Sequence, residues 1–170
     1  ADMSAQNYDA SLISSTQRQA LIAFYNSTNG DGWVVKSGWK TPPLYPDGFA
    51  MPGTEGSWLG LTVVSGTVTG ISLYNNNLSG TIPPELGNLT GLQTLELGYD
   101  PLTGTISTEW ANLTNLRTLY ISYTQLSGTI PPWLGNLNHL TTLRLDGNQL
   151  GGTIPPELGD LAGLRMLYLS

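Results

Sequence analysis

Two stretches of the chain are almost identical: LSGTIPPELGNL at residues 78–89 and LSGTIPPWLGNL at residues 126–137. They differ at one position, and diverged copies of the same pattern stand at residues 102–113 and 150–161. The four copies follow one another at intervals of 24 residues. A fixed period of this length is the sequence signature of a protein built from stacked structural repeats. The period therefore predicts a repeat fold for the larger part of the chain.

Leucines mark the start of each repeat in the order L-x-x-L-x-L. The first leucines of successive repeats are Leu92, Leu116, Leu140 and Leu164. A single coil cannot cover its own apolar face, so the coils must stack and bury these leucines against one another. The alternation L-x-L has the period of two that indicates a strand, and neighbouring strands pair about 4.8 Å apart. We therefore expect one short strand per coil.

The second half of each repeat predicts a return path of another kind. It carries proline pairs at residues 83–84, 131–132 and 155–156. Proline lacks a backbone donor and is excluded from the interior of regular helices. These residues therefore indicate short polyproline or 3₁₀ segments on the convex side of the stack.

The ninth position of each repeat predicts a ladder of buried side chains between coils. It is occupied by Asn76, Asp100, Thr124 and Asn148. A side-chain amide at this position can both donate to and accept from the backbone of adjacent coils. Asp100 can accept but cannot donate unless it is protonated. We therefore expect a local imperfection of the ladder at the second and third coils.

The combined pattern L-x-x-L-x-L-x-x-N-x-L and L-x-G-x-I-P-x-x-L-G-N-L resembles the plant-specific subclass of leucine-rich repeat proteins. That subclass occurs in receptor-kinase ectodomains and polygalacturonase-inhibiting proteins, and similar modules occur in bacterial and algal surface proteins. The resemblance implies an α/β-type solenoid with short parallel strands on the concave face, a 3₁₀ or polyproline-like convex side and an N-terminal helical cap. The repeats are expected at residues 68–91, 92–115, 116–139 and 140–163, with a partial repeat at 164–170.

Residues 1–67 lack the repeat and are expected to form the N-terminal cap. The segment Thr16–Gln19 fits a capping box, and an apolar stripe at helical spacing follows it. We therefore expect a helix at about residues 16–26. The sequence NSTNGDG at residues 26–32 then predicts a tight turn, since the full calcium loop of twelve residues is absent.

The end of the cap departs from the plant pattern because the chain has no cysteine. In the plant subclass a cysteine pair brackets this region, and Gly56 and Val63 stand where the resemblance places that pair. We expect packing of Trp33, Trp39 and Trp58 to hold the cap together instead. The sequence YNSTNGDGW at residues 25–33 is more similar to Cys-free bacterial or algal variants of the family.

Composition excludes several classes of function. The net charge is −6 with no basic stripe, which argues against a nucleic-acid partner. No stretch of about 18 to 20 apolar residues is present, so we expect no membrane insertion of this segment. The absence of cysteine excludes thiolate metal sites, and the single histidine, His139, is expected at the surface. No nucleophile elbow, phosphate loop or metal cluster is found, so we expect neither an enzyme nor a cofactor.

The concave face is where variable residues point outward between the buried leucines. Five of the eight tyrosines fall at these positions. Tyrosine and arginine are the residue types enriched in interface hot spots. Plain preference of tyrosine for strands is the alternative explanation. The candidate ligand-binding residues are Tyr74, Glu96, Tyr99, Tyr120, Tyr123, Arg144, Asp146 and Tyr168.

Two features lie outside the concave face. Trp133 replaces a glutamate of the other repeats, so we expect it to be exposed, either contacting a partner or packing on the prolines of its own coil. A row of hydroxyls is expected down one side of the stack, formed by Thr81, Thr105, Thr129 and Thr153. Regular threonine rows occur in ice-binding solenoids, although threonine at this position is also the family consensus.

The leading hypothesis is a non-catalytic, receptor-like recognition module that binds a protein, peptide or glycan on its concave face. The alternatives are an adhesive spacer within a longer surface protein and an ice-binding solenoid. The resemblance implies an extracellular or cell-surface location. The acceptor pattern N-x-S/T at Asn26, Asn77, Asn88 and Asn112 permits a glycoprotein. Because the sequence ends at Ser170 inside the fifth expected strand, we expect this segment to belong to a longer chain.

Overall fold

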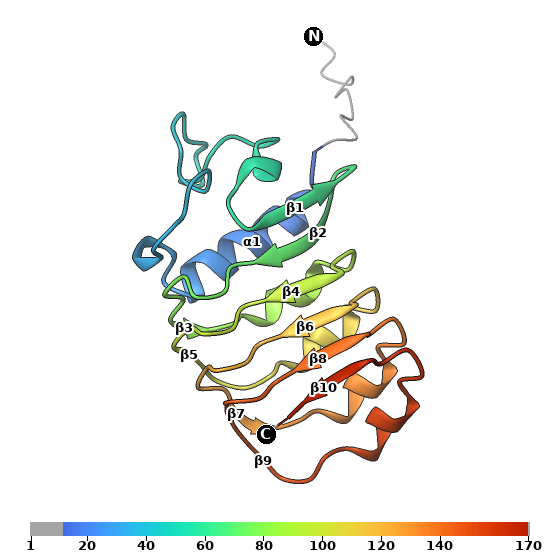
Figure 1. The fold of residues 1–170 in the computed structure, drawn as a ribbon. Helices are drawn as coiled ribbons and strands as arrows, with labels where there is room; N and C mark the ends of the chain where they lie inside the picture. The colour runs from blue at the N-terminus through green and yellow to red at the C-terminus, as the bar shows by residue number, and fades with distance from the viewer. Residues whose placement is uncertain (1–11, 170) are drawn as a thin grey trace.

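The computed structural model describes residues 12–169, over which the chain forms a short solenoid (Figure 1). Its main sheet has six strands in the order β1-β2-β4-β6-β8-β10. β1 is antiparallel to β2, and every later neighbour is parallel. The predicted alternation of one strand per coil is therefore confirmed. The strands are β1 (Leu61–Val64), β2 (Thr67–Ser72), β4 (Thr94–Glu96), β6 (Thr118–Tyr120), β8 (Thr142–Arg144) and β10 (Met166–Tyr168).

A row of apolar side chains in strict register forms the spine of the stack. Leu119 pairs with Leu95 on one side and with Leu143 on the other. All three are at most 1% exposed. Burial of a leucine side chain stabilises a fold by about 1.5–3 kcal/mol, so this row is the main source of cohesion between coils. Leu167 continues the row in β10, where no further described strand covers it, and it is 45% exposed.

The convex side consists of 3₁₀ turns, as the proline pairs predict. The turns are η3 (Pro84–Asn88), η4 (Thr108–Asn112), η5 (Pro132–Asn136) and η6 (Pro156–Asp160). Pro83, immediately before η3, has the extended backbone of a polyproline segment. Two small parallel sheets join strands and turns. They pair β3 (Gly80–Thr81) with β5 (Leu102–Thr103) and β7 (Ser127–Thr129) with β9 (Gln149–Gly151).

The cap replaces a coil at the N-terminal end of the stack. Helix α1 (Ser15–Ser27) packs beside η3, while β1 extends the sheet beyond β2 (Figure 1). The short turns η1 (Gly30–Gly32) and η2 (Glu55–Ser57) complete it. The helix starts slightly earlier than predicted, and the expected capping box at Thr16–Gln19 is wrong. Ser14 is the N-cap and accepts a hydrogen bond from the backbone of Gln17.

The observed N-cap, Ser14, also forms no capping box, because the side chain of Gln17, three residues later, points elsewhere. The side-chain amide of Gln17 donates to the carbonyl of Gly66 and accepts from the backbone of Val68, at 3.0 and 2.8 Å. The amide therefore ties α1 to the β1–β2 turn and to the start of β2. A residue used for such a distant contact cannot also bond the first turn of its own helix.

Aromatic packing holds the cap together without a disulfide bond. Trp39 lies at the centre of the cluster, with ring centroids 5.1 Å from Trp33, 4.8 Å from Trp58 and 5.4 Å from Tyr25. All four side chains are buried. Aromatic pairs at these distances contribute about 0.5–1.5 kcal/mol each beyond the burial of their area.

An ion pair under the same cluster was not predicted. Arg18 is buried and pairs with Glu55 and Asp47. Its Nη2 also donates to the carbonyl of Ala50 at 2.7 Å. The guanidinium lies 5.4 Å from the ring centroid of Trp58. Its partners are 29 and 37 residues away in sequence, so no local pattern could have predicted the contact.

A disulfide bond should form readily where the family resemblance places one. A Cβ on Gly56 would lie 3.8 Å from the Cβ of Val63, which is the usual separation across a disulfide. The variant Gly56→Cys/Val63→Cys should be more stable than the parent by about 2.5 kcal/mol when oxidised, because the loop entropy of the unfolded chain falls. Denaturation in urea with and without reductant measures the difference. Equal stability in both conditions would contradict the assigned geometry.

Candidate functional site

The fifth position of each repeat forms one continuous row across the concave sheet. Register places Ser72 beside Glu96, Glu96 beside Tyr120, and Tyr120 beside Arg144. Tyr168 completes the row next to Arg144. Their side chains alternate with buried leucines along each strand, so all of them face the same side of the sheet.

Arg144 joins two tyrosines of this row. Its guanidinium carbon lies 4.7 Å from the ring centroid of Tyr120 and 4.7 Å from that of Tyr168. Each contact is a cation–π interaction, which contributes about 0.5–1 kcal/mol at an exposed site. The three side chains therefore form a ladder across β6, β8 and β10, three strands that lie side by side in the sheet (Figure 1).

Asp146 lies beneath this ladder and is only 6% exposed. It accepts from Nη2 of Arg144 at 3.1 Å and from the hydroxyl of Ser122 at 2.6 Å. Burial acts to raise the pKa of Asp146, but these two hydrogen bonds outweigh it and hold the pKa below the usual value. The structure thus assigns Asp146 the task of orienting Arg144, whereas the sequence suggested an outward-facing contact residue.

Tyr99 and Tyr123 form a second aromatic group beside the row. Their ring centroids are 4.7 Å apart with an angle of 16° between planes. Both side chains are 50% exposed. The ring of Tyr120 lies beside them, since a Cβ added to Gly98, the residue before Tyr99, would be 3.0 Å from its Cε2. Burial and the neighbouring hydroxyl of Tyr99 raise the pKa of Tyr120. The sequence prediction that these tyrosines share one surface agrees with this placement.

The backbone under the stacked pair is unusual. Tyr99 has φ +61° and Tyr123 has φ +55°, in the left-handed region that residues other than glycine, asparagine and aspartate rarely adopt. The equivalent residue of the next coil is Gly147, at φ +68°, and that of the preceding coil is Asn75, at φ +53°. The turn requires this conformation in every coil, and tyrosine occupies it in two of them.

Glu96 and Tyr74 extend the surface towards the cap. Glu96 accepts a hydrogen bond of 2.7 Å from the hydroxyl of Ser72. Tyr74 is 57% exposed and stacks on no other ring among residues 12–169. All eight predicted residues therefore belong to the concave sheet or its C-terminal edge, but Tyr74 stands apart from the main cluster.

A hollow of about 530 Å³ opens at the edge of the stacked pair. It is lined by Asn75, Tyr99, Asp100, Pro101, Tyr123, Thr124, Gln125 and Gly147. The hollow is shallow and mostly apolar, which suits an extended ligand better than a small enclosed one.

The row of buried side chains at the ninth repeat position also forms hydrogen bonds between coils, with the expected imperfection at Asp100. Asn148 Nδ2 donates to the carbonyls of Ile121 and Leu145 at 2.6 and 2.9 Å. Asp100 is 2% exposed, and its Oδ1 accepts two backbone hydrogen bonds. Its Oδ2 is buried without any partner, because a carboxylate cannot donate as the amide of Asn148 does.

The substitution Asp100→Asn should stabilise the fold by about 1–2 kcal/mol at pH 7, because an orphaned buried acceptor becomes a donor. Burial raises the pKa of Asp100 in the folded state. The protonated carboxyl of Asp100 therefore contributes to folding stability fully below the unfolded-state pKa near 4. This contribution is lost as pH rises through the folded-state pKa. Urea denaturation from pH 3 to 8 should show that the stability of Asp100→Asn over the parent grows with pH. A gain independent of pH would contradict this explanation.

Trp133 is not the exposed residue that the sequence predicts. Its side chain is half-buried against the hydrophobic core, and its Nε1 is buried without a hydrogen-bond partner. His139 is exposed, as predicted, with its Nδ1 3.0 Å from the carbonyl of Thr114.

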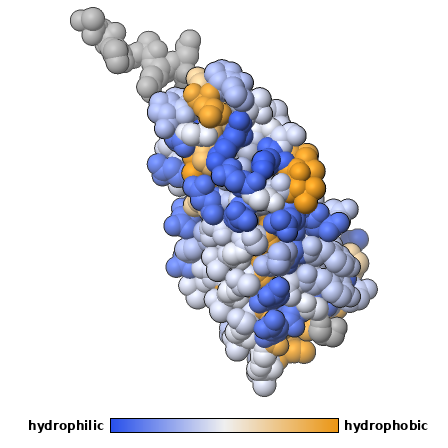
Figure 2. Space-filling view, turned by 90° about the vertical axis from the view of Figure 1, so that its left-hand side faces the viewer, coloured by the Kyte–Doolittle hydropathy of each residue, from blue (hydrophilic) through white to orange (hydrophobic). Residues whose placement is uncertain are grey.

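The threonine row lies on the side of the molecule that carries β3, β5, β7 and β9, and all four of its members are exposed. Figure 2 views the molecule from this side, where the repeats are mostly white and pale blue, the colours of intermediate hydropathy. The methyl of Thr81 lies 3.1 Å from where a Cβ of Gly104 would stand. Threonine methyls therefore pack against the next coil, which gives the row a structural role.

Two further features bear on function. Among the described residues no helix is long and apolar enough to span a membrane. Within residues 12–169 there is also no group of three or more acidic, histidine or cysteine side chains that could hold a metal ion.

Comparison with known proteins agrees with the fold. A family model described as Leucine Rich Repeat matches residues 67–89, and one described as Leucine Rich repeats (2 copies) matches residues 114–156. The curated Receptor protein-tyrosine kinase CEPR2 of Arabidopsis thaliana is 38% identical over 92 residues. That match covers 53% of this chain and 8% of the receptor, so the chain spans less than a tenth of this relative.

Two solved structures illustrate the likeness. The BIR2 ectodomain from Arabidopsis thaliana is 26% identical and covers 92% of this chain and 80% of its own, with a TM-score of 0.77. The plant peptide hormone receptor RGFR1, solved in complex with RGF2, is 42% identical over 57% of this chain and 16% of its own, with a TM-score of 0.56. With its 24-residue period, its solenoid of parallel strands and 3₁₀ turns, and these likenesses, the chain is a leucine-rich repeat protein with repeats of the plant type.

Proposed function

We propose that this chain is a non-catalytic recognition module that works outside the cell or at its surface. It binds a peptide, protein or glycan on its concave face. The contact residues are Tyr74, Glu96, Tyr99, Tyr120, Tyr123, Arg144 and Tyr168, with Asp146 orienting Arg144. The relatives support this role, because one of them is a peptide hormone receptor solved with a bound partner.

The observation that carries the proposal is the conformation of Tyr99 and Tyr123. The left-handed conformation costs an L-residue with a Cβ roughly 1–2 kcal/mol, and glycine at the same position of the next coil avoids this cost. Strain of this kind is concentrated at functional sites. Two half-exposed tyrosines kept at such positions contribute little to the core, so their benefit is best explained by contact with a ligand.

Loss of the tyrosine cluster should abolish binding without unfolding the protein. Peptides are first selected on the parent protein from a displayed random library, and their Kd is measured by fluorescence anisotropy. The variant Tyr120→Ala/Tyr123→Ala should bind at least about 30-fold more weakly, as hot-spot truncation does. The control Thr105→Ala/Thr129→Ala, on another side of the coils, should bind as the parent does.

Thermal unfolding of all variants separates loss of contact from loss of fold. A Tyr120→Ala/Tyr123→Ala variant that keeps its Tm and also keeps its affinity would contradict the proposal. Such a result would favour the spacer alternative, in which the stack only separates other parts of a surface protein.

Ice binding is the second candidate, favoured by the four exposed threonines in one row. Its readout is thermal hysteresis of the parent protein, which should vanish in Thr105→Tyr or Thr129→Tyr. Absence of hysteresis in the parent ends this candidate. The packing of threonine methyls on the next coil already accounts for the row without an ice surface.

A further inference from the structure

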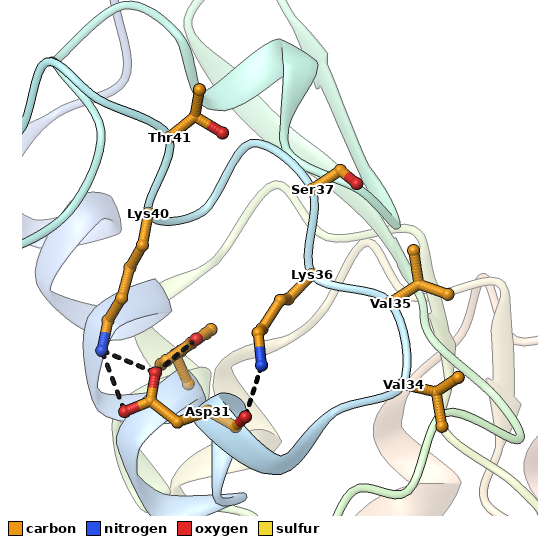
Figure 3. Close-up of a pocket in the computed structure, with 8 residues that line it drawn as sticks. Asp31, Val34, Val35, Lys36, Ser37, Lys40 and Thr41 are labelled. Atoms are coloured by element: carbon orange, nitrogen blue, oxygen red, sulfur yellow. Dashed lines mark hydrogen bonds and ion pairs between the residues drawn. The ribbon is translucent and has the colours of Figure 1, made fainter.

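Both lysines of the chain line a single pocket of the cap. The pocket has a volume of about 350 Å³ and is lined by Tyr25, Asp31, Val34, Val35, Lys36, Ser37, Lys40 and Thr41. Figure 3 shows the two lysine side chains converging on Asp31 from separate parts of the loop. Two of the six cationic side chains of a chain with net charge −6 are thus concentrated at one place.

The pocket carries an excess of positive charge. Lys40 forms an ion pair with the carboxylate of Asp31 at 2.8 Å, and its ammonium lies 4.9 Å from the ring centroid of Tyr25. Lys36 donates to the main-chain carbonyl of Asp31 and forms no ion pair with a carboxylate among residues 12–169. Asp31 therefore offsets one of the two charges, and a net charge of about +1 remains for a ligand.

The lysine pocket is linked to the tyrosine cluster by a third hollow. That hollow is lined by Val35, Leu59, Gly60, Ser72, Leu73, Tyr74, Asn75 and Asn76. It shares Val35 with the lysine pocket and Asn75 with the hollow beside Tyr99 and Tyr123. The three hollows are therefore neighbours, and we call the line that they form from the cap to the middle of the repeats the track.

Hydrogen bonds fix the cap loop against the first coil. The backbone nitrogen of Val34 donates to the carbonyl of Asn76 at 3.0 Å. Asn76 also exchanges side-chain hydrogen bonds with the backbone of Val35, at 2.7 and 2.8 Å. The loop thus adds one layer to the stack at this edge, and Val35 lies between the lysine pocket and the hollow at the first coil.

The length of the track suits a short peptide. Four steps of about 4.8 Å separate the Val35 layer from Gly147, which gives about 19 Å. An extended chain rises about 3.3 Å per residue, so about six residues span this length. The three hollows are open to solvent, so the ligand would lie on the surface over its whole length.

The stacked tyrosines favour a peptide over a sugar. One face of each ring is covered by the other ring, and Tyr123 also lies over Gly147, where an added Cβ would be 2.7 Å from Cδ1. The flat ring faces that a sugar would stack on are therefore largely used within the protein. The exposed edges and the hollow beside them suit apolar or aromatic side chains of a peptide.

We propose that the ligand is an extended peptide of about six residues with a carboxylate at one end, which Lys36 and Lys40 bind, while its other end lies on Tyr99 and Tyr123. The proposal rests on the proposed function and adds the chemistry and direction of its ligand. The carboxylate is either the C-terminus of the peptide or an Asp or Glu side chain. Both sources present the same anionic group to the lysines.

The test uses the peptides selected on the parent protein. Each is made in three forms: unchanged, amidated at its C-terminus, and with Asp and Glu replaced by Asn and Gln. Kd values are measured on the parent and on Lys36→Gln/Lys40→Gln. The variant Arg117→Gln/Arg165→Gln makes the same change of net charge at two exposed arginines outside the track, and it serves as the matched control.

One of the two neutralised peptides, either the amidated form or the form without Asp and Glu, should bind the parent about 10-fold more weakly than the unchanged peptide. The variant Lys36→Gln/Lys40→Gln should bind the unchanged peptide about 10-fold more weakly than the parent does. The two losses should not add, because they remove the same contact. The arginine control should bind every form as the parent does. Which form loses affinity identifies the carboxylate.

Three results would overturn the proposal. The first is that both neutralised peptides bind the parent as tightly as the unchanged one. The second is that the lysine and arginine variants lose affinity equally. The third is that an acidic oligosaccharide binds at the lysines where no peptide does. If the Tyr120→Ala/Tyr123→Ala variant still loses binding while the lysine variant does not, only the lysine contact is wrong. If neither variant loses binding, or no peptide can be selected, the proposed function fails as well.

Discussion

Replacing Arg18 with methionine should lower the free energy of unfolding by about 3–5 kcal/mol. Glu55 is 2% exposed, and without Arg18 its carboxylate would be buried with no cationic partner. Removing one member of a buried ion pair costs far more than the pair contributes, because the remaining charge stays desolvated. Equilibrium denaturation in urea at pH 7 measures the change.

The matched control removes the second charge as well. Arg18→Met/Glu55→Gln should recover a large part of the lost stability, because the deeply buried carboxylate is then gone and the remaining one, that of Asp47, is partly exposed to water. The side-chain hydrogen bond from Arg18 also outweighs burial and holds the pKa of Asp47 below its usual value. Stability from this contact is therefore present above the unfolded-state pKa and is lost as pH falls through the folded-state pKa. A loss under about 1 kcal/mol in Arg18→Met would contradict the importance of the pair.

The substitution Leu119→Ala should cost about 2–5 kcal/mol, the usual range for truncation of a buried leucine. Leu119 is 1% exposed and lies in register between Leu95 and Leu143, so a cavity at this position faces two coils that cannot both collapse into it. Thr118→Ala is the matched control, since Thr118 is only half-buried on the same strand. Urea denaturation should show a loss several times larger for Leu119→Ala. A loss below about 1 kcal/mol would contradict the assignment of Leu119 to the spine.

The periodic part of the fold could be predicted from the sequence because each repeat position has one environment in every coil. The alternation around Leu119 is enough to place Tyr120 outward and in line with Glu96 and Arg144. The proline pairs likewise predict the convex turns. Residues at the same repeat position have the same surroundings in every coil, so one correct assignment of a position as buried or exposed applies to the whole stack.

The cap could not be predicted in the same detail because its contacts follow no period. Arg18, Asp47 and Glu55 are far apart in the sequence and meet only in the folded cap. The lysine pocket was also missed, although the occurrence of both lysines within five residues is a signal that could have found it.

Within the repeats, the errors concern residues whose surroundings differ between coils. Trp133 stands where other coils carry glutamate, and a large apolar side chain turns back towards the core where a carboxylate would stay in water. Repeat position predicts an outward-facing Asp146, but its side chain is buried beneath the partly exposed Arg144, two residues earlier, with which it pairs. Repeat position predicts the direction of the backbone, whereas the side chain responds to its particular neighbours.

The central claim is that the concave tyrosine surface is the recognition site. Its most direct test is a map of ¹H–¹⁵N chemical-shift changes when a selected peptide is titrated into the labelled protein. The largest changes should occur in β4, β6 and β8 and in the edge residues Tyr99 and Tyr123. Changes confined to the convex turns η3 to η6, with the concave strands unaffected, would contradict it.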